Sequence, residues 1–190
     1  DYEDLPVSLA VNPGAGPDIH PEAPGNLAYD WAKGDEEATA KAFAAAAHTT
    51  KLYVGDNRII ANSMESRGCF AQPDGERLHL AYGGQGVWNT KQSMAKAFGL
   101  KPEDVRITNP DVGGGFGMKA FNYPETFVVA HAARVLGKPV RWMSERTEAM
   151  LSDNSGRDLV SEAELALDDT HKILAYRVTN THNLGAYNSY

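Results

Sequence analysis

The chain has 190 residues, 42% of them hydrophobic, so it can bury a core as one domain or two small ones. Its formal charge of -7 argues against nucleic acid as the main partner, because phosphate binding needs clustered Lys and Arg. The single cysteine, Cys69, excludes an internal disulfide and any zinc or iron–sulfur site built from the cysteines of this chain alone.

No apolar run approaches the ~20 residues of a membrane span. The amino-terminal stretch is acidic and proline-rich, unlike a signal peptide. The low cysteine content fits a reducing compartment, so we expect a cytoplasmic protein. The chain does not begin with Met, and it stops at Tyr190 within a strand-like region, so we expect a piece of a longer protein.

Five prolines and little periodicity mark the first part of the chain, which predicts a linker or wrapping arm over residues 1–33. Residues 34–190 are expected to form a partial domain that is truncated at its carboxyl-terminal end. This part opens with an alanine-rich helix over residues 34–47, with Asp35 as the N-cap and two glutamates in the first turn.

Short apolar or alternating runs predict strands, and apolar residues at helical spacing predict helices. The expected extended segments are 48–54, 58–64, 77–82, 105–108, 140–143, 159–167 and 173–181, with a turn at 55–57. The expected helices are 90–98, 123–136 and the shorter 146–151. The mixture predicts an α+β fold, with a mixed sheet and helices.

A glycine-rich turn stands between strand and helix at two places. The first is Gly83–Gly86 and contains Gln85, and the second lies within Asp111–Lys119, which reads DVGGGFGMK. If the two strands are neighbours in one sheet, both turns open at the same edge and form one pocket. Glycine reaches positive φ, and free backbone N–H groups at a helix start attract anionic oxygens. Phe116 would be costly in water, so we expect its ring to fill a space.

Other chemistries are weaker alternatives. A phosphate-binding P-loop is excluded, because Ala120 stands where the motif needs Ser or Thr. A dinucleotide fingerprint is a minor alternative, since Gly113 and Gly115 fit it but Met118 replaces its third glycine. Cys69 is expected to be a buried apolar residue and not a nucleophile. The six histidines show no ligand spacing.

Each glycine turn taken alone can be an ordinary connection, with Gln85 as a solvent-facing amide. Taken together, however, these segments resemble the large subunit of the molybdenum hydroxylases, the xanthine oxidase family. The likeness covers nearly the whole chain and is strongest to the carbon monoxide dehydrogenase and bacterial aldehyde oxidoreductase branch. It is carried by Tyr2–Pro6, Pro24–Leu27, Asn57–Arg58, Asn62–Arg67, Gly84–Gly86, Asp111–Lys119, Glu125, Gly137–Trp142, Ser152–Asp153, Gly156–Asp158 and Asn183–Tyr187.

The resemblance implies that Gln85, Gly115, Phe116 and Gly117 bind the cofactor, with the Phe116 N–H and the Gln85 amide facing oxygens on molybdenum. It implies a molybdenum–molybdopterin cytosine dinucleotide, with iron–sulfur and FAD centres in small and medium partner subunits. The implied reaction adds water-derived oxygen to a small molecule, such as carbon monoxide or an aldehyde. The resemblance also allows a homo-oligomer, and it places no catalytic residue or metal ligand in this chain.

Several departures from the family pattern limit which substrate and which activity we expect. Ser66 replaces the proline of the usual Met-Glu-Pro-Arg, and Ala120 replaces the glutamate of purine-oxidising members, which argues against xanthine. Neither the family's basic glutamate nor the cysteine loop of carbon monoxide dehydrogenases has a match here. We therefore expect this piece to be inactive alone. The alternatives are a non-catalytic binding or assembly module of the same fold and a small dinucleotide-binding domain.

Overall fold

The computed structural model describes residues 18–185, and they form two compact units. Of the described residues, the first unit combines 18–58 with 157–185, and the second comprises Ile59–Gly156. The division into an arm of residues 1–33 and a partial domain of residues 34–190 stays a prediction, and residues 1–17 and 186–190 lie outside the described part.

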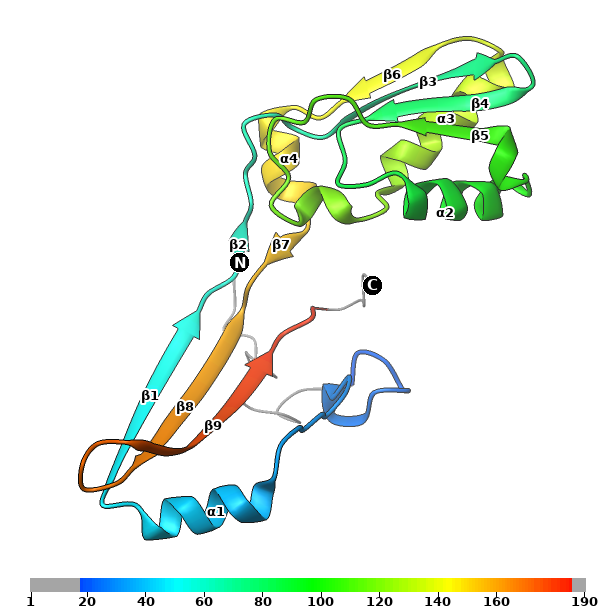
Figure 1. Cartoon of the computed structure of the whole chain (residues 1–190). Coiled ribbons are helices and arrows are strands. Elements are labelled where there is room, and N and C mark those ends of the chain that lie inside the picture. Colours follow the sequence, from blue (N-terminus) through cyan, green and yellow to red (C-terminus); the bar gives the residue numbers. More distant parts are fainter. Residues whose placement is uncertain (1–17, 186–190) are drawn as a thin grey trace. The chain divides into compact units, whose positions relative to one another are not determined.

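The first unit is a three-stranded antiparallel sheet with one helix packed on it (Figure 1). Its strand order is β1-β8-β9, and a short 3-10 helix, η1 (Pro24–Asn26), precedes the sheet. The elements are α1 (Glu36–Ala45), β1 (His48–Asp56), β8 (Leu159–Leu167) and β9 (Ile173–His182). Asp35 caps α1 as predicted, because its carboxylate accepts from the Ala38 N–H at 2.9 Å.

The second unit is built on a four-stranded sheet of order β5-β4-β3-β6. Only the β4–β5 pair is parallel, and the other two pairs are antiparallel. The strands are β3 (Gly68–Asp74), β4 (Arg77–Tyr82), β5 (Val105–Thr108) and β6 (Val140–Met143). The helices are α2 (Trp88–Phe98), α3 (Pro124–Leu136) and α4 (Arg146–Ser152), and the 3-10 turns are η2 (Pro102–Asp104) and η3 (Met118–Ala120). A separate pair of two-residue strands joins β2 (Ile59–Ile60) to β7 (Ser155–Gly156).

The core of this unit lies between the sheet and helices α2 and α3 (Figure 1). Strand side chains alternate across a sheet, so every second residue of β3 and β4 meets the helices. The buried apolar side chains are Cys69, Ala71, Leu78, Leu80, Met94, Ala95, Val105, Val129, Ala130 and Ala133. Leu80 on β4 and Met94 on α2 are fully buried in this core, which fixes the face of β4 that turns towards the helices.

The predicted α+β fold is confirmed, and most expected elements occur within one or two residues of their bounds. The expected turn at 55–57 is wrong, because β1 pairs with β8 as far as Asp56. The expected extended segment 58–64 is only partly correct, since only Ile59 and Ile60 pair. Strand β3 was not predicted, because it contains Gly68 and Pro73 and alternates weakly.

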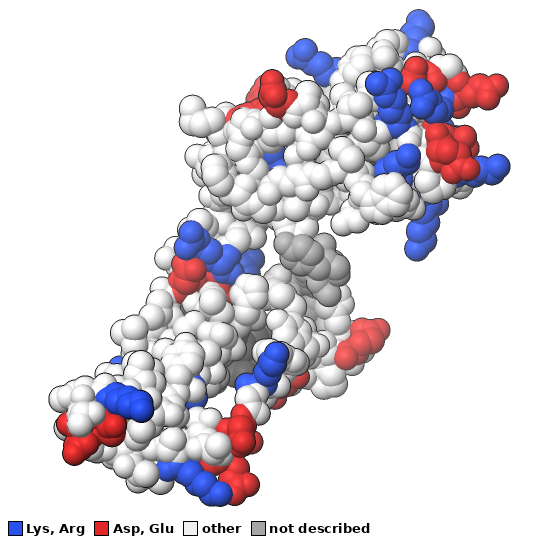
Figure 2. Space-filling model, viewed as in Figure 1, with Lys and Arg blue, Asp and Glu red and all other residues white. Residues whose placement is uncertain are grey.

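Charged side chains of both signs are mixed on the surface. Among the described residues on the face in Figure 2, Lys and Arg lie near Asp and Glu and build no extended basic patch. Within residues 18–185, no helix combines the length and the apolar character needed to cross a bilayer.

We predict that Leu80→Ala lowers the free energy of unfolding by about 2–5 kcal/mol, because it leaves a cavity in the core of the second unit. Val128→Ala on α3 is the control, since Val128 is 64% exposed and should change stability by less than about 0.5 kcal/mol. Urea unfolding measures both. Equal effects of the two substitutions would contradict the core assignment.

Candidate cofactor-binding site

The two glycine-rich turns meet at one edge of the four-stranded sheet. Strands β4 and β5 are parallel neighbours, so the turns that follow them leave at the same edge. Gln85 Oε1 accepts from the backbone N–H of Gly117 at 2.9 Å and of Lys119 at 3.2 Å, and the Gln85 N–H donates to the Lys119 carbonyl at 3.2 Å. The predicted convergence of the two turns is therefore confirmed.

These contacts also fix which way the Gln85 amide points. Because the N–H groups of Gly117 and Lys119 are donors, the amide oxygen of Gln85 must face them, and its Nε2 donor points the other way. Within residues 18–185, neither this Nε2 nor the backbone N–H of Gly115 or Phe116 has a hydrogen-bond partner. The two turns thus present several neutral donors that a ligand can use.

In the second turn, neighbouring atoms come very close to two of the glycines. A Cβ at Gly115 would lie 2.5 Å from Gln85 Oε1, and a Cβ at Gly113 would lie 2.6 Å from the Cβ of Glu65. A Cβ at Gly113 would collide with Glu65, and a Cβ at Gly115 would displace the Gln85 amide from its contacts. The glycines therefore form a cradle that only bare backbone can build.

Phe116 lies at the tip of the second turn with a left-handed φ of +52°, and its ring is 76% exposed. The prediction that this ring fills a space is wrong for the described residues. Gly114 and Gly117, on either side of Phe116, both have positive φ, and a Cβ at Gly114 would lie 3.0 Å from the Phe116 ring. This arrangement leaves the Phe116 backbone close to the Gln85 contact.

Glu65 and Lys119 form an ion pair behind the glycine turn that the sequence did not predict. The Lys119 side chain is fully buried, and its Nζ lies 2.7 Å from Glu65 Oε2. The same oxygen accepts from the Gly113 N–H at 2.9 Å, and the Glu65 N–H donates to the Gly113 carbonyl at 3.1 Å. The Lys119 hydrogen bond lowers the pKa of Glu65 against the opposing effect of burial.

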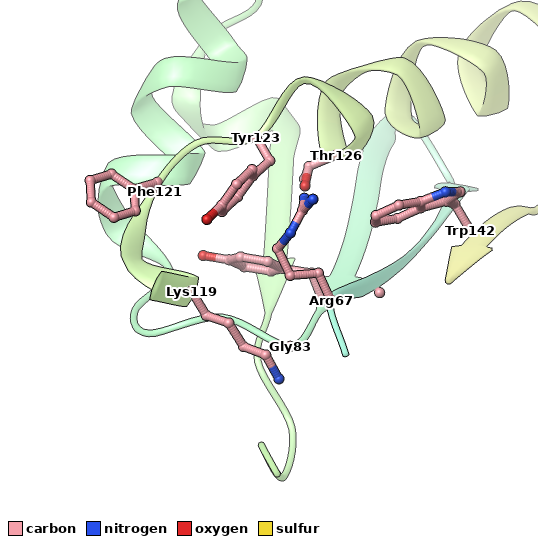
Figure 3. A pocket seen from close by; sticks show the side chains of 9 residues that line it. Arg67, Gly83, Lys119, Phe121, Tyr123, Thr126 and Trp142 are labelled. Atoms are coloured by element: carbon pink, nitrogen blue, oxygen red, sulfur yellow. The ribbon is translucent and has the colours of Figure 1, made fainter. Parts of the chain in front are cut away.

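Arg67 is the centre of a second buried polar cluster, and Figure 3 shows its side chain beside the rings of Tyr123 and Trp142. Its Nε lies 2.5 Å from Asp153 and its Nη1 lies 3.1 Å from Glu125. The guanidinium also stacks on the ring of Tyr123, with its carbon 3.7 Å from the ring centroid, and faces Trp142 (Figure 3). Arg67, Glu125 and Asp153 belong to separate motifs of the sequence, and the fold brings them together.

Two hollows adjoin these residues. The enclosed one lies among Arg67, Lys119 and Tyr123 (Figure 3), and it has room for about one water molecule. The open one is a groove of about 210 Å³ at the ends of β3, β4 and β6. Its lining includes the charged residues Glu65, Asp111 and Arg141.

The weaker sequence candidates do not come together. Cys69 faces the helices, and burial, together with the Glu125 charge, raises the pKa of its thiol to about 11. Cys69 therefore has the character of an inert buried thiol. His79 lies on the opposite face of the sheet from Cys69, and its Nε2 is 2.8 Å from the hydroxyl of Thr108. Among residues 18–185, no three His, Cys, Asp or Glu side chains are arranged to hold a metal ion.

Comparison with known proteins gives consistent matches. The family profile of the molybdopterin cofactor-binding domain matches residues 19–190. The chain is 35% identical to the gamma subunit of the 6-hydroxypseudooxynicotine dehydrogenase complex of Paenarthrobacter nicotinovorans, over 98% of this chain and 24% of that protein. It is 31% identical to the carbon monoxide dehydrogenase large chain of Hydrogenophaga pseudoflava, over 100% of this chain and 26% of that one.

A solved structure shares the fold. The reconstituted CO dehydrogenase from Oligotropha carboxidovorans matches 77% of this chain and 18% of that chain, with a TM-score of 0.70 and 30% sequence identity. The chain thus spans about a quarter of the length of the curated relatives named above.

We predict a pH-dependent contribution of Glu65 to stability. Because its pKa is lowered on folding, this contribution is complete above the ordinary carboxyl pKa of about 4.3 and is lost as pH falls through the lowered pKa. Glu65→Gln should therefore cost about 1–3 kcal/mol at neutral pH, a modest value because 36% of the Glu65 side chain is exposed.

Urea unfolding over a range of pH measures this effect, with Glu76→Gln at an exposed turn as the control. The difference between the wild-type protein and Glu65→Gln should shrink as the solution becomes acidic. A difference that stays constant down to about pH 3 would contradict the assignment.

We also predict that Arg67→Met lowers the free energy of unfolding by about 3–5 kcal/mol, because it leaves the buried Asp153 carboxylate without its partner. Arg141→Met is the matched control, since Arg141 is exposed on β6 and should change stability by less than about 0.5 kcal/mol. Thermal unfolding followed by circular dichroism compares them. Similar melting temperatures for the two variants would refute a structural role for the Arg67 cluster.

Proposed function

Because the chain belongs to the molybdopterin cofactor-binding domain family of xanthine oxidase-type large subunits, we propose that its two glycine turns hold a molybdenum–molybdopterin cofactor. The residues that would hold it are Gln85, Gly115, Phe116 and Gly117. The observation that carries this proposal is the fixed orientation of the Gln85 amide. Its oxygen accepts from two N–H groups of the second turn, and its Nε2 has no partner among the described residues and can donate to a ligand.

The donor set suits this cofactor. Anionic oxygens need hydrogen-bond donors, and neutral donors held rigidly in place can stabilise them without a cationic side chain. The Gln85 Nε2 and the N–H groups of Gly115 and Phe116 are such donors. At Gly117, which has a φ of +87°, no described residue lies within 4 Å of the position a Cβ would take, so the cradle stays open there.

The bound cofactor supplies the redox chemistry, and the residues of this chain bind and orient it. We propose that the whole protein is an oxidoreductase that adds water-derived oxygen to a small molecule. The relatives are named for carbon monoxide and for 6-hydroxypseudooxynicotine, so the substrate class extends from carbon monoxide and aldehydes to nitrogen-containing organic molecules. Ala120 argues against a purine substrate. We assign no catalytic residue to this chain.

Partner subunits are part of the same proposal. The relatives are called a gamma subunit and a large chain, names that belong to multi-subunit complexes. We propose an iron–sulfur small subunit and a flavin medium subunit as partners, with the cofactor in its cytosine dinucleotide form. We also propose that such complexes form a homo-oligomer and that the protein is cytoplasmic.

The two alternatives have less support. A dinucleotide-binding domain of the doubly wound type needs a mostly parallel sheet, and among the described strands only β4 and β5 pair in parallel. A non-catalytic binding or assembly module of the same fold would have no need for the close approach of Gly115 to Gln85. Substitutions at these two residues therefore separate the functions.

We predict that Gln85→Ala and Gly115→Val each lower the molybdenum content and the oxidase activity of the whole protein by about 10–100-fold, as loss of residues that orient a metal group commonly does. Gln85→Ala removes the donor, and Gly115→Val pushes the Gln85 side chain away. Metal analysis by mass spectrometry and a dye-reduction assay with an aldehyde measure the two quantities.

Gly156→Ala is the matched control, since a Cβ at Gly156 would meet no atom of residues 18–185 within 4 Å. It should retain wild-type molybdenum content. If the Gln85 and Gly115 variants also retain wild-type metal content and activity, the non-catalytic module becomes the better explanation.

A further inference from the structure

We propose that Glu65 and Lys119 act as positioning residues that hold the first half of the glycine turn in place for the cofactor. This inference rests on the proposed function, because it concerns the same turn. It adds two residues that do not themselves contact the proposed ligand. Their role is to fix the backbone that carries Phe116.

The turn is anchored at two points, one on each side of Phe116. On the carboxyl-terminal side, Gln85 accepts from the N–H groups of Gly117 and Lys119. On the amino-terminal side, Glu65 accepts from the N–H of Gly113 with one carboxylate oxygen and donates its own N–H to the Gly113 carbonyl. Phe116 lies between the anchors with a positive φ, so both anchors are needed to define where its N–H points.

Lys119 connects the two anchors. Its backbone N–H and carbonyl bond to Gln85, while its side chain runs through the interior and ends 2.7 Å from the Glu65 carboxylate. An ammonium group with no exposed surface needs a negative partner, so Lys119 holds the Glu65 carboxylate at one position. That position is also the one that meets the Gly113 N–H.

The stability of the ion pair and its positioning role can be separated by experiment. Glu65→Ala leaves a buried ammonium without a partner, whereas Lys119→Met leaves a carboxylate that water can still reach, since 36% of the Glu65 side chain is exposed. Glu65→Ala should therefore destabilise the protein more. Adding Lys119→Met to Glu65→Ala removes the unpaired ammonium and should recover stability, but no carboxylate then accepts from the Gly113 N–H.

The first test is hydrogen–deuterium exchange of the turn in the whole protein, which needs no bound cofactor. We expect the Gly113 amide to exchange about tenfold faster in Lys119→Met than in the wild-type protein, equivalent to about 1.4 kcal/mol. The amides of Gly117 and Lys119 should keep their protection, because the Gln85 contact remains. General loosening would instead raise exchange at all three amides.

The second test is the molybdenum content of the whole protein purified from cells that make the cofactor. The Glu65→Ala/Lys119→Met double variant should show near wild-type stability but retain about tenfold less molybdenum. Leu80→Ala is the control for stability, because it weakens the core and leaves both members of the ion pair in place. It should retain more molybdenum than the double variant even though it is less stable.

Each outcome decides between the possibilities. If the double variant recovers both stability and molybdenum, or if Gly113 exchange is unchanged in Lys119→Met, the pair is only structural and the positioning role is refuted. If Gln85→Ala also leaves the molybdenum content unchanged, the proposed function fails as well. Normal metal content in the Glu65 and Lys119 variants, with loss in Gln85→Ala, overturns this inference alone.

Discussion

The parallel pairing of β4 with β5 is the constraint on which the candidate site depends. Parallel strands end at the same edge of a sheet, so the turns that follow them start as neighbours however far apart they lie in the sequence. An antiparallel pairing of the same strands would send the turns to opposite edges and separate Gln85 from Gly115. The helices α2 and α3 that follow the turns bury the apolar face of these strands and hold this pairing.

Side chains next to the turns then fix the backbone conformation of the second turn. Gln85 bonds to the backbone after Phe116, Glu65 bonds to the backbone before it, and Lys119 belongs to both sets of contacts. Arg67, two residues after Glu65, ties the start of β3 to α3 and α4 through Glu125 and Asp153. One short segment of sequence therefore supports both the turn and the helices behind it.

Much of this arrangement could be predicted from sequence, because local chemistry determines it. Asp35 capping α1 and Gly137 ending α3 are local signals that the structure reproduces. The convergence of Gln85 with the glycine turn needed only the assumption that β4 and β5 are neighbours. The partners of Glu65 could not be predicted, since they depend on which residues 48 and 54 positions away fold next to it. The only sequence signal was a charged residue within a motif, and such a residue is usually solvent-exposed.

Phe116 shows where a general rule gave the wrong expectation. Large apolar side chains are usually buried, but this ring lies at the tip of a turn whose backbone is constrained on both sides. Gly113 and Gly115 allow close approach, Gly114 and Gly117 supply the positive φ, and the residue between them projects outward. The pattern is consistent if the backbone of Phe116, and not its ring, is the functional part. A turn that presents N–H groups must expose them, and the side chain on the same residue is then exposed with them.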